Sequence, residues 1–544
     1  MRTSRKEFYY AKRIIATEGN VVGAENLIEN RDDFVSFSGS NCCILTNENG
    51  VHSSVIIDFG REICGGVRIL NQAIIAREKL QNVKVRLVFG ESVSEAMSQI
   101  GGKKNATNDH SPRDFETLLS ALSTVDYGKT GFRFLKIELL DDNVGIKLKN
   151  VIGICELPDV DRIGYIKTDD ERLDAILETA FYTSQLNMQD GYILDGIKRD
   201  RLVWSGDLFS EILTVLYTFG DAENIPNSLD LLRKTTGKGA WINGIPTYDA
   251  WWILNLCTYC KYTGKRDYFR ENYDYVRFIV DEFDACVSES GDMDFKATGK
   301  RCGMEFYLDW PTEGTPDMIP GTALIIHYAL STLKDLGYDA ELSEKSEKIC
   351  KRLSKYIYAN TDAKQVIALQ VLAGNRDQAL REKLERGGAE GVSTFMSYFI
   401  LKALDVLGSE KAIDIAKEYY GAMLDRGATT FWEDFNVSWL DGSGRIDEIP
   451  RDGERDLHGD YGAFCYVGLR HSLCHGWSSG VYPFAIEKLL GLDMKSEAFG
   501  EVEIRLPDCG IKICEAKIPT PHGDIEITDG KLTAVPNDVK ISVK

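Results

Sequence analysis

The feature that most constrains this fold is a long central run of helix-type periodicity, residues 166–492, with strand-type sequence on both sides. Segments such as TDDERLDAILETAFYTSQLNMQD repeat apolar residues at spacings of three and four, which is typical of amphipathic helices. Loops rich in aromatic residues, Gly and Pro separate these segments. No similarity recurs at the ~34 to 47 residues of common helical repeats, which disfavours an ordinary solenoid. The run therefore predicts a toroid of six helical hairpins, an (α/α)6 barrel.

The two flanking regions have the short alternating runs and polar turns of β-strands. Residues 1–165 contain runs such as SSVIIDFG, VKVRLVFGE and GFRFLKIELL, which predict a β-sandwich. Within that region, the polar residues 98–115 predict a long exposed loop. The last strand-type region is too small to fold alone and should pack on the barrel. The predicted chain is thus multidomain: 1–165 as an N-terminal β-sandwich, 166–492 as the (α/α)6 barrel and 493–544 as a C-terminal β-domain.

Charge and composition exclude several classes of partner. The formal net charge of −20 leaves no basic face for nucleic acid or an anionic membrane surface. No run approaches the ~20 apolar residues of a membrane span, and the first residues lack the apolar core of a signal peptide. The 13 cysteines are scattered and odd in number, which favours reduced thiols. We therefore expect a cytoplasmic protein with no nucleic-acid and no membrane partner.

The cysteines and histidines show no metal-binding pattern. The CxxC pair Cys257 and Cys260 lies in an apolar, aromatic stretch typical of a core helix, and zinc would need two further ligands. Of the seven histidines, all but His475 lack any interpretable spacing. No metal, no cofactor and no calcium-dependent carbohydrate module are expected.

All eight tryptophans lie between positions 204 and 477, and most stand beside a carboxylate or a Gly or Pro. Sugar sites combine aromatic platforms for apolar C–H faces with carboxylates that accept hydrogen bonds from hydroxyls. Packing in a large helical core is the alternative for each tryptophan, helix capping for each aspartate, and a core position for the histidine. On this argument the candidate substrate-binding residues are Asp249, Trp252, Asp309, Trp310, Trp432 and His475.

The stretch ILDGIKRDRLVWSGDLFSE, residues 193–211, places three carboxylates and three cations around Trp204. A salt-bridged helix end would explain such a charge run, with Asp207 acting only as an N-terminal helix charge. A plain surface helix, however, needs neither the tryptophan nor the Ser-Gly step after it. The charged residues in question are Asp195, Lys198, Arg199, Asp200, Arg201 and Asp207.

Within this stretch, DGIKRDRLVWSGD resembles the signature of the α-L-rhamnosidases of glycoside hydrolase family 78. In that family an Asp opens the motif, an acidic residue follows an Arg, and W-[ST]-G-D closes it. TTFWED is similar to the later stretch that carries the family's catalytic base. VIIDFGREICGGVRI, LVFGESV, LCHGWSSG and PTPHGDIEI are similar to flanking parts, so the likeness extends over the whole chain. Two departures are that many members have Glu in place of Asp200, and that DGIK replaces the commoner D-C-P.

The resemblance implies that Asp200 is the general acid and Glu433 the general base, and that Asp195 and Asp207 hold rhamnose hydroxyls beside Trp204. Family members invert the anomeric configuration, which requires carboxyl groups ~6.5 to 9.5 Å apart to admit a water. Asp200 must hold a proton, which repulsion from the neighbouring carboxylates favours. Inward-pointing cations would oppose this, so at least one of Arg199 and Arg201 is expected to point outward and pair with a structural carboxylate.

The expected function is hydrolysis of terminal α-L-rhamnosyl groups from small glycosides or oligosaccharides. One alternative is an (α/α)6 glycosidase for another deoxy or uronic sugar. The other is a non-catalytic sugar-binding protein that keeps the hydroxyl-binding Asp195 and Asp207. The aglycone, the linkage and the oligomeric state, a homodimer included, stay open.

Overall fold

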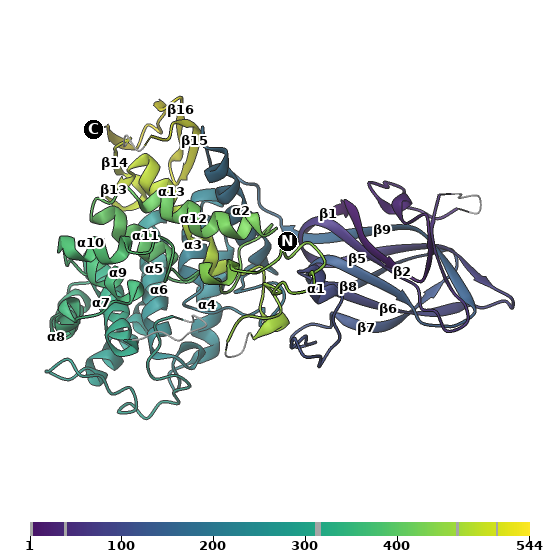
Figure 1. Ribbon diagram of the computed structural model, residues 1–544. Helices are drawn as coiled ribbons and strands as arrows, with labels where there is room; N and C mark the ends of the chain where they lie inside the picture. Colours follow the sequence, from purple (N-terminus) through teal and green to yellow (C-terminus); the bar gives the residue numbers. More distant parts are fainter. Residues whose placement is uncertain (1–3, 37–40, 310–316, 464–466, 507–509, 544) are drawn as a thin grey trace.

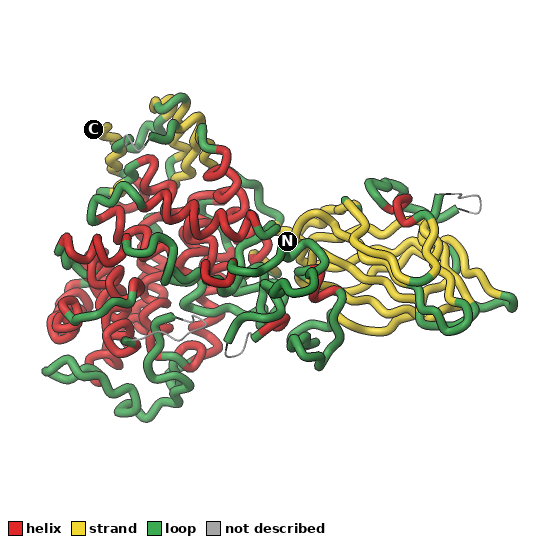
Figure 2. The backbone as a smooth tube through the Cα atoms, viewed as in Figure 1, coloured by secondary structure: helices red, strands yellow, loops and turns green. Residues whose placement is uncertain are grey.

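The computed structural model describes residues 4–36, 41–309, 317–463, 467–506 and 510–543. It consists of an N-terminal domain of strands, a helical domain, and C-terminal strands packed on the helices (Figure 1). Figure 2 shows the separation of the two large parts, with strands on one side and helices on the other. The prediction of a multidomain chain with a central helical domain and sheet-rich flanks is confirmed at this level.

The N-terminal domain is an antiparallel network of nine strands in the order β3-β4-β9-β5-β8-β6-β7, with β1 on β9 and β2 on β5. Its hydrophobic core consists mainly of Val, Ile, Leu and Phe side chains that are distributed along the strands. Alternation of buried and exposed positions, as in β4, follows from the two-residue period of a strand. The strands are β1 (Ser4–Tyr10), β2 (Arg13–Glu18), β3 (Asn20–Val22), β4 (Cys43–Asn47), β5 (Ser54–Ala76), β6 (Asn82–Gly90), β7 (Asp114–Ser120), β8 (Ser123–Leu139) and β9 (Val144–Pro158).

The helical domain is organised around a ring of alternate helices. Helices α3, α5, α7, α9, α11 and α13 contact one another in succession, and α13 contacts α3 again. Every residue of α3 is buried, whereas only five of the fourteen residues of α8 are, so apolar helices lie inside and amphipathic ones outside. The helices are α2 (Glu171–Asn187), α3 (Leu208–Phe219), α4 (Asn224–Thr236), α5 (Pro246–Thr263), α6 (Arg266–Cys286), α7 (Met318–Leu336), α8 (Ala340–Leu353), α9 (Lys364–Leu372), α10 (Gln378–Glu385), α11 (Ser397–Val406), α12 (Ala412–Asp425) and α13 (Val481–Leu490).

The C-terminal strands form two small sheets against the helices. One runs β10-β15-β16-β17, and its first strand comes from before the helical domain. The other contains β13, β14 and β18, with β14 and β18 parallel. Pairing of β10 with β15 thus joins the entry and the exit of the helical domain. These strands are β10 (Tyr165–Thr168), β13 (Asp493–Met494), β14 (Glu501–Ile504), β15 (Ile513–Thr520), β16 (Gly523–Thr528), β17 (Lys531–Ala534) and β18 (Lys540–Val543).

Buried ion pairs fix the N-terminal domain to the helical domain. Asp58 on β5 accepts hydrogen bonds from Arg133 on β8 at 2.8 and 2.9 Å and from Arg13 at 2.9 Å. Arg133 also donates to the carbonyl of Gly427 at 2.8 Å and lies 3.4 Å from Asp447. The two-pronged contact with Asp58 holds the Arg133 side chain in place, and the contacts of Arg133 with Gly427 and Asp447 join the two domains.

The predicted exposed loop at residues 98–115 is in part a contact region. Arg113 is buried and pairs with Glu95 of the short helix α1 (Val93–Ala96) at 3.2 Å. Asp109 pairs with Arg470 at 2.7 Å, which brings the loop against the segment before α13. The prediction of an exposed loop was wrong for Arg113, because long-range ion pairs leave no local sequence pattern, whereas Asp109 is exposed.

The eleven cysteines among the described residues are free thiols, and Cys257 and Cys260 are buried in α5. Among the helices that the structure describes, none combines the length and apolar character that a bilayer crossing requires.

Candidate active site

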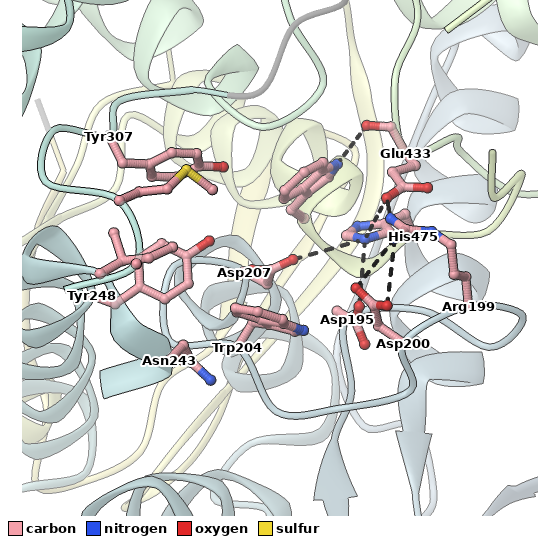
Figure 3. A pocket seen from close by; sticks show the side chains of 14 residues that line it. Asp195, Arg199, Asp200, Trp204, Asp207, Asn243, Tyr248, Tyr307, Glu433 and His475 are labelled. Carbon is pink, nitrogen blue, oxygen red and sulfur yellow. Dashed lines mark hydrogen bonds and ion pairs between the residues drawn. The ribbon is translucent and has the colours of Figure 1, made fainter. Parts of the chain in front are cut away.

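A cavity of about 340 Å³ opens in the helical domain (Figure 3). Its walls come from segments that precede α3, α5, α7 and α13 of the ring, and from the loop after α12. Residues far apart in the sequence therefore meet at one end of the ring. The lining residues are Asp195, Arg199, Asp200, Trp204, Asp207, Asn243, Ile245, Tyr248, Gly303, Met304, Tyr307, Glu433, His475 and Trp477.

Four carboxyl groups face this cavity: Asp195, Asp200, Asp207 and Glu433. All four were predicted from the sequence, and the structure brings them together although Glu433 follows the other three by more than 200 positions. Asp207 occupies the N-cap position of α3, but its side chain makes no capping hydrogen bond. Its carboxyl group is therefore available to the cavity instead of to the helix end.

The loop that carries Asp200 is strained and tightly closed. Asp200 and Arg201 both have positive φ values, 52° and 57°, which non-glycine residues adopt rarely and mainly at functional sites. Asp195 closes the loop, because its backbone N–H donates to the carbonyl of Leu202 and its Oδ1 accepts the Leu202 N–H, both at 2.9 Å. The double turn directs Asp200 toward the cavity and Arg201 away from it.

Arg199 is the one cationic side chain among the described residues that line the cavity. Its Nη1 lies 3.4 Å from the carboxylate of Asp200, and its Nη2 forms an ion pair with Glu433. Arg201 points outward as expected of one of the two arginines. Its partner, however, is the backbone carbonyl of Lys129 at 3.1 Å, so the expected pairing with a carboxylate was wrong.

The two carboxyl groups that the resemblance assigns to catalysis differ in how deeply they are buried. The Glu433 side chain is 2% exposed, and its Oε2 accepts the backbone N–H of Ser472 at 3.0 Å. The Asp200 side chain is 20% exposed, and its Oδ1 lies 3.4 Å from Nε2 of His110 in the N-terminal domain. Glu433 is thus held in a fixed, water-poor position, whereas Asp200 lies nearer the opening.

Burial raises the pKa of both remaining aspartates well above the ordinary carboxyl range. For Asp195, the charges of Asp207 and Asp200 add to the effect of burial. For Asp207, the charges of Glu433 and Asp200 do so. A protonated carboxyl group both donates and accepts hydrogen bonds, which suits the binding of sugar hydroxyls.

His475 lies at the centre of the carboxyl groups. Its Nε2 is 3.9 Å from oxygens of Asp195, Asp207 and Glu433. Burial, followed by the charge of Arg199, lowers the pKa of His475 well below 6.5, so the ring is neutral at pH 7. The ring packs against Trp477 with centroids 4.2 Å apart. A neutral imidazole in this position offers polar contact without adding a second positive charge.

An aromatic wall faces the carboxyl groups. The rings of Trp204 and Tyr248 meet edge to face at 6.0 Å, and Tyr248 and Tyr307 at 5.6 Å. Trp204 was predicted, whereas Tyr248, Tyr307, Met304, Asn243 and Trp477 were not. Among the residues that were missed, helical spacing links Tyr248 to the cavity. Tyr248, at the start of α5, follows the lining residue Ile245 by three positions, so both lie on the same face.

The structure does not bring four of the predicted substrate-binding residues to the cavity. The Oδ1 of Asp249 accepts the backbone N–H of Ile242 at 2.7 Å, which is a structural role on a different face of α5. Trp252 donates to the carbonyl of Leu229 at 3.0 Å within the core. Asp309 accepts a hydrogen bond from Ser393, and Trp432 is buried against Phe435. The fifth, Trp310, lies outside the described residues.

One cluster in the described part of the chain has the donor set for a metal ion: Glu91, Glu95 and His458. The ammonium of Lys198 already lies among them, 3.1 Å from Glu91, 3.0 Å from Glu95 and 3.3 Å from His458. The cluster is therefore a buried network of ion pairs and hydrogen bonds around Lys198. The sequence spacing of His458 gave no sign of these neighbours, because Glu91 and Glu95 lie more than 300 positions earlier.

Comparison with known proteins agrees with this arrangement. Residues 161–322 match the family model described as the bacterial alpha-L-rhamnosidase 6 hairpin glycosidase domain. No curated protein sequence matches the chain. The resemblance to α-L-rhamnosidases is confirmed for residues 161–322, and the following solved structures share the fold.

The chain is similar to the GH78 family rhamnosidase of Bacillus sp. GL1, with 20% identity and a TM-score of 0.73 over 93% of this chain and 54% of that one. It is similar to the rhamnosidase from Klebsiella oxytoca with rhamnose bound, with 19% identity and a TM-score of 0.69 over 90% and 96%. It is also similar to the Streptomyces avermitilis α-L-rhamnosidase complexed with L-rhamnose, with 16% identity and a TM-score of 0.66 over 90% and 48%. The chain thus spans about half the length of the first and third proteins and nearly all of the second.

Proposed function

We propose that this protein is an inverting glycoside hydrolase that releases terminal α-L-rhamnose from small glycosides or oligosaccharides. The observation that carries the proposal is the cavity itself, in which four carboxyl groups and a neutral histidine face an aromatic wall. The family match over residues 161–322 and the rhamnose bound to two proteins of the same fold support the choice of sugar.

In the proposed mechanism, Asp200 gives its proton to the leaving glycosidic oxygen as the bond from C1 to that oxygen breaks. A water on the opposite face forms the new bond to C1 and passes its proton to Glu433. Arg199 and the backbone N–H of Ser472 hold the Glu433 carboxyl group in the position of the proposed base. One guanidinium contacts both carboxyl groups, so the proposed acid and base lie on either side of the Arg199 side chain. Inversion requires the two carboxyl groups to be ~6.5 to 9.5 Å apart, which leaves room for the water.

The two sides of the cavity match the two sides of a deoxy sugar. Asp195, Asp207 and His475 would bind hydroxyl groups, and the wall of Trp204 and Tyr248 would take the apolar C–H face and the methyl group. The volume of about 340 Å³ is at the small end for ligand cavities, which favours a single terminal sugar.

The closed contact ring of alternate helices supports an (α/α)6 toroid as the architecture of the catalytic part. We propose residues 166–492 for it, with an N-terminal β-sandwich at 1–165 and a C-terminal β-domain at 493–544. The acidic composition and the free thiols support a cytoplasmic location, where short imported glycosides would be the substrates.

Release of p-nitrophenol from p-nitrophenyl α-L-rhamnoside by the wild type, Asp200→Ala and Glu433→Ala tests the proposal. Asp249→Asn is the matched control, because Asp249 is a buried carboxylate that does not line the cavity. We expect turnover by the wild type and the control, and losses of about 100- to 10,000-fold in the other two variants.

Two other results would redirect the proposal. A wild type that hydrolyses only the p-nitrophenyl glycoside of another sugar would refute rhamnose as the substrate. A wild type inert on every glycoside, yet binding rhamnose in a calorimeter, would identify a sugar-binding protein.

A further inference from the structure

Lys198, in the loop of Asp200, is fully buried although its side chain is charged. A buried ammonium is tolerated only where carboxylates and carbonyls surround it. Its Nζ lies 3.1 Å from Glu91 and 3.0 Å from Glu95, and it donates to the carbonyls of Leu469 and His471 at 2.8 and 2.6 Å. Three separate segments of the chain therefore meet at this one group.

Both carboxylates come from the N-terminal domain. Glu91 follows β6, Glu95 lies in α1, and the Oε2 of Glu95 accepts the backbone N–H of Glu91 at 2.8 Å. Glu95 also pairs with the buried Arg113 at 3.2 Å. Two carboxylates thus face two basic side chains, Lys198 and Arg113. Burial raises the pKa of Glu91 to about 7, and Lys198 opposes that rise.

The ammonium lies close in sequence to the proposed acid. Lys198 precedes Arg199 and Asp200 directly, and the carbonyl of the preceding residue, Ile197, accepts a hydrogen bond from Gly131 on β8 at 3.0 Å. The positive φ at Asp200 means that the loop needs external contacts to keep its shape. The contacts of Lys198 and Ile197 with the N-terminal domain supply them.

The same cluster reaches the proposed base by a second route. The Oε2 of Glu91, which pairs with Lys198, also accepts the backbone N–H of Leu473 at 2.6 Å. The N–H of the preceding residue, Ser472, donates to Oε2 of Glu433 at 3.0 Å. Two adjacent backbone N–H groups therefore connect Glu91 of the N-terminal domain with Glu433.

We propose that Lys198 is a positioning residue, which, with Glu91 and Glu95 of the N-terminal domain, fixes the loops of Asp200 and Glu433 relative to each other. The names acid and base rest on the proposed function, whereas the contacts do not. Proton transfer requires the donor within hydrogen-bond reach of the leaving oxygen, and a displacement of ~1 Å costs about 100-fold in rate. The N-terminal domain is on this account part of the catalytic unit.

The first test compares Lys198→Met with Lys402→Met, whose ammonium pairs with the half-buried carboxylate of Glu487, and neither Lys402 nor Glu487 lines the cavity. We expect kcat of Lys198→Met on p-nitrophenyl α-L-rhamnoside to fall about 100-fold with KM nearly unchanged. The loss should be larger on phenyl α-L-rhamnoside, because phenoxide is the poorer leaving group and depends more on the acid. Should Lys198→Met fail to fold, Glu95→Gln removes one charge of the cluster and keeps Lys198.

The second test needs no substrate. Amide hydrogen exchange in residues 196–202 and 471–474 should be faster in Lys198→Met or Glu95→Gln than in the wild type, and unchanged in Lys402→Met. If the wild type hydrolyses no rhamnoside, the proposed function fails while this measurement still decides the role of Lys198. Exchange in both segments that is unchanged from the wild type would overturn the proposal. So would a loss of kcat in Lys198→Met that is the same on the two rhamnosides and no larger than the loss in Lys402→Met.

Discussion

Glu211 provides a prediction about stability that follows from burial alone. Its carboxyl group lies inside α3 beneath the cavity, and neither oxygen has a hydrogen-bond partner among the described residues. Burial, followed by the charges of Asp207 and Asp195, raises the pKa of Glu211 well above 4.5. The folded protein therefore keeps a proton on Glu211 that the unfolded chain has lost at neutral pH.

The sign of the effect follows from proton linkage. Below pH 4.5 both states hold the proton, and Glu211 adds no pH dependence. Above that value unfolding releases a proton, so the free energy of unfolding falls by about 1.4 kcal/mol per pH unit until the folded-state pKa is reached. Glu211→Gln keeps the shape and removes the titration. The variant should thus gain stability relative to the wild type as the pH rises from 5 to 7.

Urea unfolding at pH 5, 6 and 7, followed by tryptophan fluorescence, measures this difference. All eight tryptophans lie between positions 204 and 477, so the signal reports the helical domain and not the N-terminal strands. Any cost of burying the glutamine amide is the same at each pH, so the slope and not the offset is diagnostic. A stability difference that stays flat from pH 5 to 7 would refute the protonated, unpaired state of Glu211.

Three further predictions concern packing, domain contact and binding. Gly476→Ala should destabilise the protein by about 1 to 3 kcal/mol in thermal unfolding, because the new Cβ would lie 2.0 Å from the carboxyl carbon of Glu211. Gly239→Ala is the control, since its new Cβ would meet no atom within 4 Å. Asp58→Asn should cost about 1.5 to 3 kcal/mol by removing the charged two-pronged partner of Arg133, which keeps only Asp447 at 3.4 Å. Asp126→Asn on the surface should cost at most about 1 kcal/mol, and equal losses in urea unfolding would contradict this. Trp204→Ala should raise KM for p-nitrophenyl α-L-rhamnoside about tenfold, while Trp252→Phe, in the core, leaves KM unchanged.

Local patterns in the sequence predict the order of the domains, because apolar residues repeat with different periods in strands and in helices, and a short window is enough to tell them apart. They also predict Asp195, Asp200 and Asp207, since these residues share one contiguous motif. The residues that were missed come from other segments. Asp249 was predicted because it is a carboxylate beside a tryptophan, and Tyr248 was not considered. The helical rotation between neighbours points Tyr248 to the cavity and Asp249 to the N–H of Ile242.

Long-range contacts have no counterpart in local patterns. Lys198 was interpreted as one of several cations that fix the loop, and its partners Glu91 and Glu95 lie more than 100 positions earlier. Arg199 likewise binds Glu433 from a distant segment, so its inward direction could not be predicted. Tertiary structure, not propensity, decides which charges of a dense motif meet and which face solvent.

The most direct test of the acid–base assignment is the anomeric configuration of the first product, followed by ¹H NMR as wild-type enzyme hydrolyses an aryl α-L-rhamnoside. If Glu433 activates water opposite Asp200, β-L-rhamnose appears first and then equilibrates slowly to the α anomer. Initial formation of α-L-rhamnose would mean a covalent intermediate and a nucleophile in place of a base, and would contradict the account.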